Sequence, residues 1–319
     1  MALHGDQVAT GSGDHGIRVY NVDSGVFSRE LYSKKYGHHE WVTSLSYLNN
    51  GRLLSGGMDN LLCLWDAKGV RCDFLKGHDG SISKVMTDDY NVGVSSSYDT
   101  TMMIWDLDTK KSATRLMGVH KEPVLDFDWH NSLLVSGDKN GYIVMWDVNE
   151  AKPIKVRKCH QGGVSQIILH SDSLKHHLIF TAGINDGTLC AHDMRTNDIV
   201  YSQQLHKGAI NAVKVNLSNM ITTASADKNI KLVDIVSGFK TYGTMAGTDA
   251  VFCLENIHNI TLAGSGDGNL LAYDNDTCEC LYGYGVMQKG AVRCIKIAED
   301  KTKLVAAGDD PTPLLLYYI

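Results

Sequence analysis

Histidine, hydroxyl and acidic or amide side chains recur together along this sequence, in an order that would suit nucleophilic catalysis. A serine becomes a nucleophile when a histidine takes its proton and a carboxylate orients that histidine. The four sets are His38, Ser55 and Asp59; His78, Ser95 and Asp99; His120, Ser136 and Asn140; and His206, Thr223 and Asp227. A catalytic triad occurs once in an active site, whereas this set is repeated. We therefore predict a structural role for these side chains and no catalytic residues.

The four sets belong to a longer repeat whose elements must position them. In each repeat a turn of small residues carries an acidic or amide side chain, and an apolar or aromatic residue follows six positions later. The pairs are Asp14/Tyr20, Asp59/Trp65, Asp99/Trp105, Asn140/Trp146, Asp186/His192, Asp227/Val233 and Asp267/Tyr273, and a degenerate eighth runs from Asp310 to Leu316. The steps between the first seven apolar or aromatic positions are 40 to 46 residues long. Such regular spacing indicates one structural unit repeated along the chain.

Within a repeat, apolar and polar residues alternate with a period of two. Residues 42–48, 51–56, 61–66 and 70–75 are predicted strands, separated by turns rich in Gly, Asn and Asp. No segment shows a sustained helical stripe of apolar residues. A four-stranded antiparallel sheet cannot bury both of its faces alone, so the repeats must stack on one another. The pattern predicts an all-β chain of stacked four-stranded sheets.

Three segments match a known repeat in register. They read GHHEWV and SGGMDNLLCLWD in residues 37–66, GHDGSI and SSSYDTTMMIWD in residues 77–106, and VHKEPV and SGDKNGYIVMWD in residues 119–147. With these motifs the sequence resembles the WD-repeat (WD40) family over essentially its whole length. The resemblance implies a β-propeller, in which each four-stranded sheet is one blade.

The resemblance also implies a role for the repeated polar side chains. In that family a His before the first strand, a Ser or Thr on the second, an Asp in the next hairpin and a Trp on the third form one network in each blade. Here the set is complete at Trp65 and Trp105. Asn140 replaces Asp beside Trp146, and Val233 replaces Trp.

The later repeats depart further from that pattern. The fifth repeat has His160 and Asp186, with Ala182 at the Ser position and His192 at the Trp position. The seventh and eighth repeats have no matching His, so we expect them to be the least rigid.

The number of repeats leads us to predict eight blades in a single domain spanning residues 1–319. The first blade should lack most of its inner strand and the last its outer strand. The repeat units are residues 1–36, 37–76, 77–118, 119–158, 159–205, 206–246, 247–287 and 288–319. The alternative is seven blades, with residues 1–25 forming an extra hairpin or a remodelled closure.

Composition narrows the function classes. The chain has 319 residues, 43% of them hydrophobic, a net charge of −6 and no run of five like charges. We expect no nucleic-acid or membrane binding, because neither a basic patch nor a long apolar segment is present. The eight cysteines are scattered, and no His or Cys spacing suggests zinc, so we expect neither metal nor cofactor. We expect the protein to be cytoplasmic. The alternative is a protein present in both the cytoplasm and the nucleus.

One group of apolar residues is a candidate site for partner proteins. Trp41, Met58 and Tyr98 lie in loops that should share one rim of the propeller, with Glu40 and Asp79 at the margin. Tryptophan and tyrosine are favoured at binding hot spots because they bring large contact area at low entropic cost. The alternative is that Trp41 packs between two blades.

A second motif suggests a more specific role. Residues 179–195, IFTAGINDGTLCAHDMR, resemble the box by which some WD-repeat proteins act as substrate receptors of cullin-type ubiquitin ligases. The resemblance implies that Asp193 and Arg195 contact the ligase adaptor. The sequence departs from that box at Ile184, Ala191 and His192.

These observations lead to one functional prediction and one alternative. We predict a non-catalytic scaffold or adaptor that binds other proteins through the propeller rim, within a multiprotein complex. The alternative is a substrate receptor of a cullin-type ubiquitin ligase. An enzyme is disfavoured, because the predicted first strands carry few charged residues, and opposite charges among them can pair.

Overall fold

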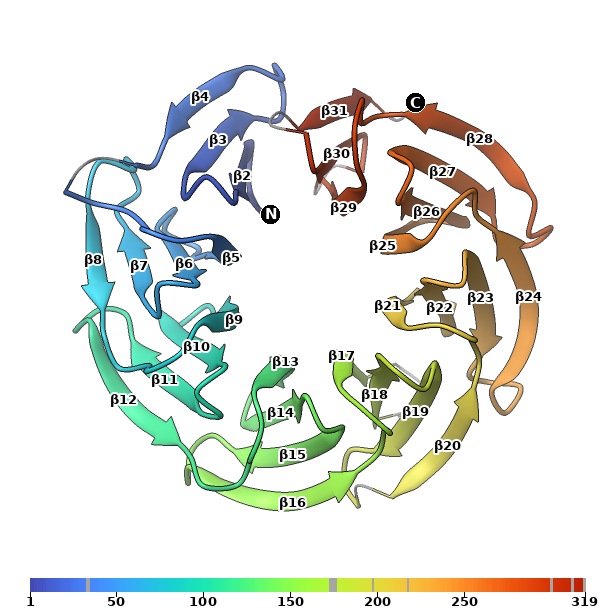
Figure 1. Ribbon diagram of the computed structural model, residues 1–319, viewed down its shortest axis with the longest axis horizontal. Helices are drawn as coiled ribbons and strands as arrows, with labels where there is room; N and C mark the ends of the chain where they lie inside the picture. Colours follow the sequence, from blue (N-terminus) through green and yellow to red (C-terminus); the bar gives the residue numbers. More distant parts are fainter. Residues whose placement is uncertain are drawn as a thin grey trace. The chain divides into compact units, whose positions relative to one another are not determined.

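The computed structural model describes residues 1–32, 35–171, 177–196, 198–216, 218–298, 301–310 and 313–317. Every regular element among them is a β-strand, β1 to β31 in Figure 1. None of these residues belongs to a helix long and apolar enough to cross a membrane. The chain forms two compact units: unit 1 comprises Met1–Lys139 and Val144–Val156, and unit 2 comprises Asn140–Ile143 and Arg157–Ile319.

The first sixteen strands form four sheets. They are β1 (Ala2–His4), β2 (Gln7–Gly11), β3 (Ile17–Asn21) and β4 (Phe27–Glu30); β5 (Val42–Tyr47), β6 (Leu53–Gly57), β7 (Leu62–Trp65) and β8 (Cys72–Leu75); β9 (Ile82–Thr87), β10 (Val92–Ser97), β11 (Met102–Asp106) and β12 (Lys111–Leu116); and β13 (Val124–His130), β14 (Leu133–Asp138), β15 (Tyr142–Asp147) and β16 (Lys152–Lys158). In each sheet, neighbours in sequence are neighbours in space.

The remaining fifteen strands form four further sheets in unit 2. They are β17 (Val164–Ser171), β18 (His177–Gly183), β19 (Thr188–Asp193) and β20 (Ile199–Gln204); β21 (Ile210–Val215), β22 (Met220–Ser225), β23 (Asn229–Asp234) and β24 (Lys240–Ala246); β25 (Val251–Ile257), β26 (Ile260–Ser265), β27 (Asn269–Asp274) and β28 (Cys280–Gly285); and β29 (Val292–Ile297), β30 (Lys303–Gly308) and β31 (Leu314–Tyr317). Neighbouring strands pair in an antiparallel manner, as β21 does with β22 and β29 with β30.

The predicted count of eight blades is corrected by these sheets. Seven sheets have four antiparallel strands and are complete blades, whereas β29–β31 has only three strands among the described residues. The architecture is therefore that of seven four-stranded blades, with the eighth repeat forming an incomplete sheet. Residues 1–25 do not form a separate hairpin, because β1 pairs with β2 and completes a four-stranded sheet at the start of the chain. The sequence overcounted because it counts repeats, whereas a blade also needs a fourth strand.

The acidic residue between the second and third strands shapes its own turn. Its carboxylate accepts a hydrogen bond from the backbone N–H two residues later, at distances of 3.2 Å (Leu61 to Asp59), 2.9 Å (Thr101 to Asp99) and 3.0 Å (Asn229 to Asp227). The intervening residue takes a positive φ, 66° at Asn60 and 69° at Thr100. An Asx turn of this kind explains why an acidic or amide side chain recurs at this position.

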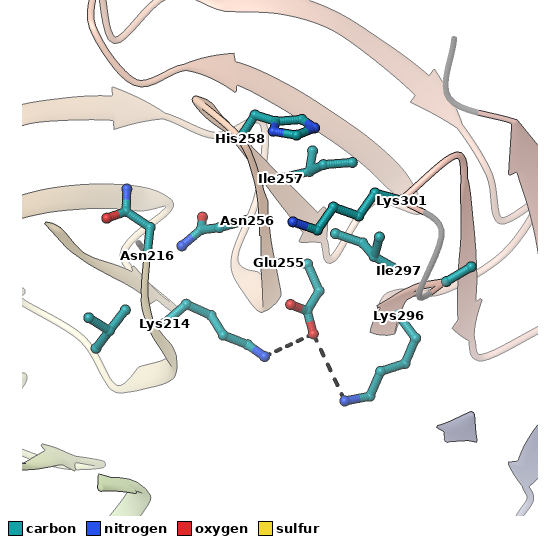
Figure 2. Close-up of a pocket in the computed structure, with 11 residues that line it drawn as sticks. Lys214, Asn216, Glu255, Asn256, Ile257, His258, Lys296, Ile297 and Lys301 are labelled. Carbon is teal, nitrogen blue, oxygen red and sulfur yellow. Dashed lines mark hydrogen bonds and ion pairs between the residues drawn. The ribbon is translucent and has the colours of Figure 1, made fainter. Parts of the chain in front are cut away.

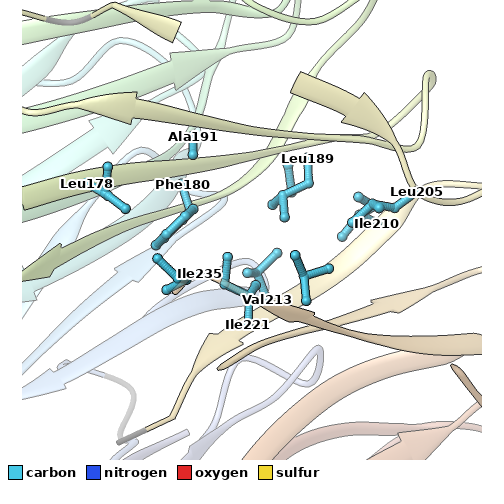
Figure 3. Close-up of a cluster of buried hydrophobic side chains, with 11 residues drawn as sticks. Leu178, Phe180, Leu189, Ala191, Leu205, Ile210, Val213, Ile221 and Ile235 are labelled. Carbon is cyan, nitrogen blue, oxygen red and sulfur yellow. The ribbon is translucent and has the colours of Figure 1, made fainter. Parts of the chain in front are cut away.

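The core lies between stacked sheets inside each unit. Figure 3 shows one such cluster, where Phe180 and Leu189 of the β17–β20 sheet face Ile210, Val213 and Ile221 of the next sheet. Every residue of β6 and β7 is buried, in keeping with the expected stacking of the sheets. The reason is that a middle strand is covered by another sheet on each side. Most residues of the fourth strands β12 and β20, by contrast, are exposed.

Candidate functional site

The structure brings the repeated polar side chains together in unit 1. His38 Nδ1 lies 3.0 Å from Asp59 Oδ1, and its Nε2 lies 2.8 Å from Ser55 Oγ. Trp65 Nε1–H donates to the same hydroxyl at 3.0 Å. The next sheet repeats this arrangement with His78, Ser95, Asp99 and Trp105 at distances of 2.8 to 2.9 Å. Each ring nitrogen and the indole N–H therefore has a partner inside the fold.

The third network corrects one predicted residue. His120 Nδ1 bonds Asp138 Oδ2 at 2.9 Å, whereas the sequence predicted Asn140 as the acidic or amide member of this network. Its Nε2 lies 2.7 Å from Ser136 Oγ, to which Trp146 Nε1–H donates at 2.8 Å. Asp138 is the last residue of β14, before the hairpin begins, and it is buried beside the His120 ring. Asp138 lies two residues before the hairpin position that Asn140 occupies. The sequence comparison aligned the repeats on that hairpin position and therefore selected Asn140.

The networks of unit 2 are less complete. His206 bonds Asp227 at 3.1 Å and Thr223 Oγ1 at 2.9 Å, but a buried Val233 stands where the other networks have tryptophan. The sequence placed Ala182, which has no hydroxyl, at the Ser position of the fifth repeat, whereas the structure supplies a hydroxyl from the preceding residue, Thr181. Thr181 Oγ1 lies 2.9 Å from His160 Nε2 and 3.4 Å from His192 Nε2.

The fifth-repeat network also leaves buried nitrogens unsatisfied. His160 Nδ1 is 3.4 Å from Asp186 Oδ2, and neither it nor His192 Nδ1 makes a hydrogen bond with the described residues. Burial, with smaller contributions from the charges of Arg157 and His160, lowers the pKa of His192 to about 4. Burial also lowers the pKa of His160, although Asp186 opposes this shift. Both rings are therefore neutral at pH 7.

The electrostatics of the complete networks fit a structural role. Burial alone would raise the pKa of the Asp59 carboxyl, but hydrogen bonds from His38 and from backbone N–H groups outweigh it and lower that pKa. The same balance lowers the pKa of Asp99. The hydroxyls of Ser55, Ser95 and Ser136 have no exposed surface, so a substrate could not reach them. An inaccessible hydroxyl cannot serve as a nucleophile.

The predicted partner-binding residues lie at the surface of unit 1. The exposed fractions of Trp41, Met58 and Tyr98 are 56%, 43% and 50%. Backbone bonds link their loops, because Met58 N–H donates to Trp41 O at 2.8 Å and Tyr98 N–H donates to Ser81 O at 2.9 Å. Ser81 Oγ–H in turn donates to Met58 O at 3.1 Å. We call the three side chains the apolar rim patch.

The margins of the rim patch are acidic. Glu40 is exposed, and the Asp79 side chain is 82% exposed. Arg115 Nη2 lies 3.3 Å from both Asp79 and Asp99, so it joins this margin to the second network. The Trp41 ring also lies against Gly13, where an added Cβ would be 3.5 Å from it. Trp41 thus contacts a neighbouring hairpin while more than half of its surface stays exposed.

The two residues predicted to contact a ligase adaptor lie in unit 2. Arg195 Nη2 donates to Asp193 Oδ2 at 3.0 Å, and the Arg195 side chain is 75% exposed. The hydrogen bonds from the Arg195 side chain and backbone lower the pKa of Asp193 to about 2. His192, which directly precedes Asp193 in the predicted box, is fully buried.

Oppositely charged residues of neighbouring first strands pair in both units. Lys84 Nζ lies 2.8 Å from Asp126 Oδ1 in unit 1, and Lys214 Nζ lies 2.8 Å from Glu255 Oε1 in unit 2. Among the described residues, no group of three or more His, Cys, Asp or Glu side chains is placed to hold a metal ion.

Comparison with known proteins places this geometry in context. The model of the WD domain, G-beta repeat, matches residues 29–66, 69–106 and 113–147. Protein tipD of Dictyostelium discoideum is 25% identical over 85% of this chain and 45% of its own length. WD repeat-containing protein 1 of Xenopus tropicalis is 28% identical over 63% of this chain and 34% of its own length. The chain therefore spans less than half the length of either relative.

A solved structure supports the fold. The computationally designed Ika8 protein matches with a TM-score of 0.86 and 22% identity, covering 100% of this chain and 95% of that one. At this identity the likeness concerns the fold alone.

Proposed function

Because the chain carries WD40 repeats in three places and has WD-repeat relatives, we propose that it is a non-catalytic scaffold that binds other proteins through the apolar rim patch. WD40 propellers typically bind proteins and act in complexes. One observation carries the choice of surface: Trp41, Met58 and Tyr98 are each between 43% and 56% exposed although they are large and apolar. Exposed aromatic side chains grouped on one surface are typical of protein interfaces.

The buried networks explain how the patch would be held. His38 precedes Trp41 in one loop, and Asp59 follows Met58 in the hairpin facing it. The bond between His38 and Asp59 joins these two loops beneath the exposed side chains. A partner would then bind loops that are already ordered, so that little conformational entropy is lost on the scaffold's side.

The proposal is tested by affinity purification from native cell extract. Wild type is compared with the double variant Trp41→Ala/Tyr98→Ala and with Tyr90→Ala as a matched control. Tyr90 is 85% exposed and lies in the β9–β10 hairpin of the same unit, at the opposite end of the strands from Tyr98. We expect the double variant to lose at least one stable partner that the control keeps, at equal melting temperature. Equal recovery by all three proteins would place the binding surface elsewhere.

The ligase-receptor alternative rests on Arg195. Its exposed guanidinium is available to a partner, although it is paired with Asp193. If the alternative holds, Arg195→Glu abolishes recovery of a cullin adaptor and Arg293→Glu does not. Arg293 is the matched control, because it is half exposed and paired with Asp309 in the same unit. Recovery of no adaptor by wild type would exclude this alternative.

A further inference from the structure

Unit 2 contains a pocket that lies apart from the rim patch. Its walls come from the ends of three first strands, β21, β25 and β29, and from the hairpins that lead to the second strands. Its volume is about 490 Å³, within the range of small-ligand sites. In unit 1 the rim patch lies in loops at the start of the first strands. The pocket of unit 2 lies at the other end of its first strands.

Charged side chains meet at one register position of the three strands. Lys214, Glu255 and Lys296 are each the fifth residue of their strand. The Glu255 carboxylate lies 2.8 Å from Lys214 Nζ and 3.9 Å from Lys296 Nζ, as the dashed lines of Figure 2 show. Glu255 is 16% exposed, whereas the two lysine side chains are 31% and 40% exposed. The Glu255 side chain is thus more buried than either lysine side chain.

The hairpin end of the pocket adds polar groups. Lys301 and Asn256 line this end, and Figure 2 shows the Lys301 side chain extending towards β25. The Asn256 amide is held in place, because its Oδ1 accepts from Thr261 at 3.0 Å and its Nδ2 lies 3.5 Å from Thr222 Oγ1. His258 completes this end.

The charge of the pocket defines its ligand. The Lys and Glu side chains among the described lining residues, three ammonium groups and one carboxylate, leave two net positive charges. This contrasts with the chain's overall charge of −6. Each ammonium group has three hydrogen-bond donors, and Glu255 can occupy only a part of those on Lys214 and Lys296. Two net charges match a dianion, and charge-assisted bonds to such an anion are strong.

We propose that this pocket binds the dianionic group of a phosphate monoester between Lys214, Lys296 and Lys301. Glu255 pairs with two of the ammonium groups, so it offsets one of the three positive charges and competes with the ligand for their donors. The cavity exceeds the size of a phosphate group, so it also accommodates part of the carrier. That carrier is a small molecule or a phosphorylated side chain, and the two share the chemistry that the pocket recognises.

The test is an NMR titration of the whole chain at constant ionic strength. Inorganic phosphate, O-phosphoserine, and a phosphoserine peptide with its unphosphorylated twin are the probes. We expect the amide signals of Asn216, Asn256 and Ile297 to shift with phosphate and with O-phosphoserine. Tighter binding of the phosphopeptide than of O-phosphoserine identifies a protein carrier, whereas equal or weaker binding identifies a small molecule.

The variants test the charge argument in both directions. Lys214→Gln and Lys296→Gln should each weaken phosphate binding about tenfold, because each removes a charged hydrogen bond. Glu255→Gln should tighten it, because the net charge rises. Lys240→Gln, at an exposed position on the outer strand β24, should change nothing. Absence of shifts at millimolar phosphate, lysine variants that bind as well as wild type, or binding only of long polyanions would overturn the proposal.

Discussion

The buried hydrogen-bond networks differ in completeness between the two units. Those in the second and third sheets of unit 1 are complete, whereas the one in the fifth-repeat sheet of unit 2 is not. Around Ser95, the hydroxyl bonds a histidine and a tryptophan at 2.8 Å each, and the histidine also bonds a carboxylate. Around Thr181, two histidines share the hydroxyl, and each has a buried Nδ1 without a hydrogen bond to the described residues. A buried polar group without a partner costs free energy, so the fifth-repeat sheet should be less stable and more sensitive to acid. Where the other sheet has a buried tryptophan, the fifth-repeat sheet has His192, a smaller side chain that can be protonated.

The largest effect is expected where the tryptophan network is complete. Trp105→Ala removes a fully buried indole and leaves Ser95 with one partner fewer. We expect the free energy of unfolding to fall by about 3–5 kcal/mol, the usual range for truncating a buried tryptophan. Urea unfolding followed by circular dichroism measures it. A loss below about 1 kcal/mol would mean that the network does not stabilise the sheet.

The corrected carboxylate gives the next largest effect. Asp138→Ala removes the acceptor of His120 Nδ1 and should cost about 2–3 kcal/mol, because a buried donor is left without a partner. Asn140→Ala, in the following hairpin, is the matched control and should cost clearly less. The ranking of the two variants in urea decides between the two positions. A larger loss for Asn140→Ala than for Asp138→Ala would show that Asn140 is the partner of His120, as the sequence predicted.

Acid should distinguish the fifth-repeat sheet. Because the pKa of His192 is lowered to about 4, the unfolded chain binds more protons than the folded chain below the ordinary histidine pKa near 6.5. This contribution to stability is complete above about pH 6.5 and is lost as the pH falls towards 4. Between pH 7 and pH 5 we expect a loss of about 2 kcal/mol that His192→Phe removes. Parallel stability–pH curves for the two proteins would refute the assignment.

Trp41 should give the smallest stability effect. Its side chain is 56% exposed and touches Gly13, so Trp41→Ala should cost about 1 kcal/mol or less. Thermal unfolding beside Trp105→Ala provides the comparison. A loss as large as that of Trp105→Ala would favour the packing alternative over the binding role.

Much of the fold could be predicted because it follows from local patterns. Period-two alternation and the six-residue spacing from acidic turn to Trp locate the strands, and the His, Ser and Trp of the first networks follow from them. Asp138 was missed because the hairpin, and not the histidine, was used to align the repeat. Thr181 was missed by one position, which on a strand moves a side chain to the other face. The sequence indicated that the last repeat lacks its outer strand, as β29–β31 does among the described residues, but the count of eight still treated that repeat as a blade.

The pocket could not be predicted for a related reason. Lys214, Glu255 and Lys296 are 41 residues apart in sequence, and only the stacking of β21, β25 and β29 brings them together. Each residue alone looks like an ordinary charge on a strand. The signal lies in their shared register position, which can be recognised once the strand bounds are known.

The most direct test of the scaffold account is photocrosslinking in native extract. A benzophenone amino acid is placed at Met58, within the rim patch, and at Tyr90, at the other end of unit 1. The account predicts that a discrete partner crosslinks at position 58, that none does at position 90, and that Trp41→Ala removes the crosslink. The same crosslinked proteins at both positions, or a crosslink at 58 that survives Trp41→Ala, would contradict it.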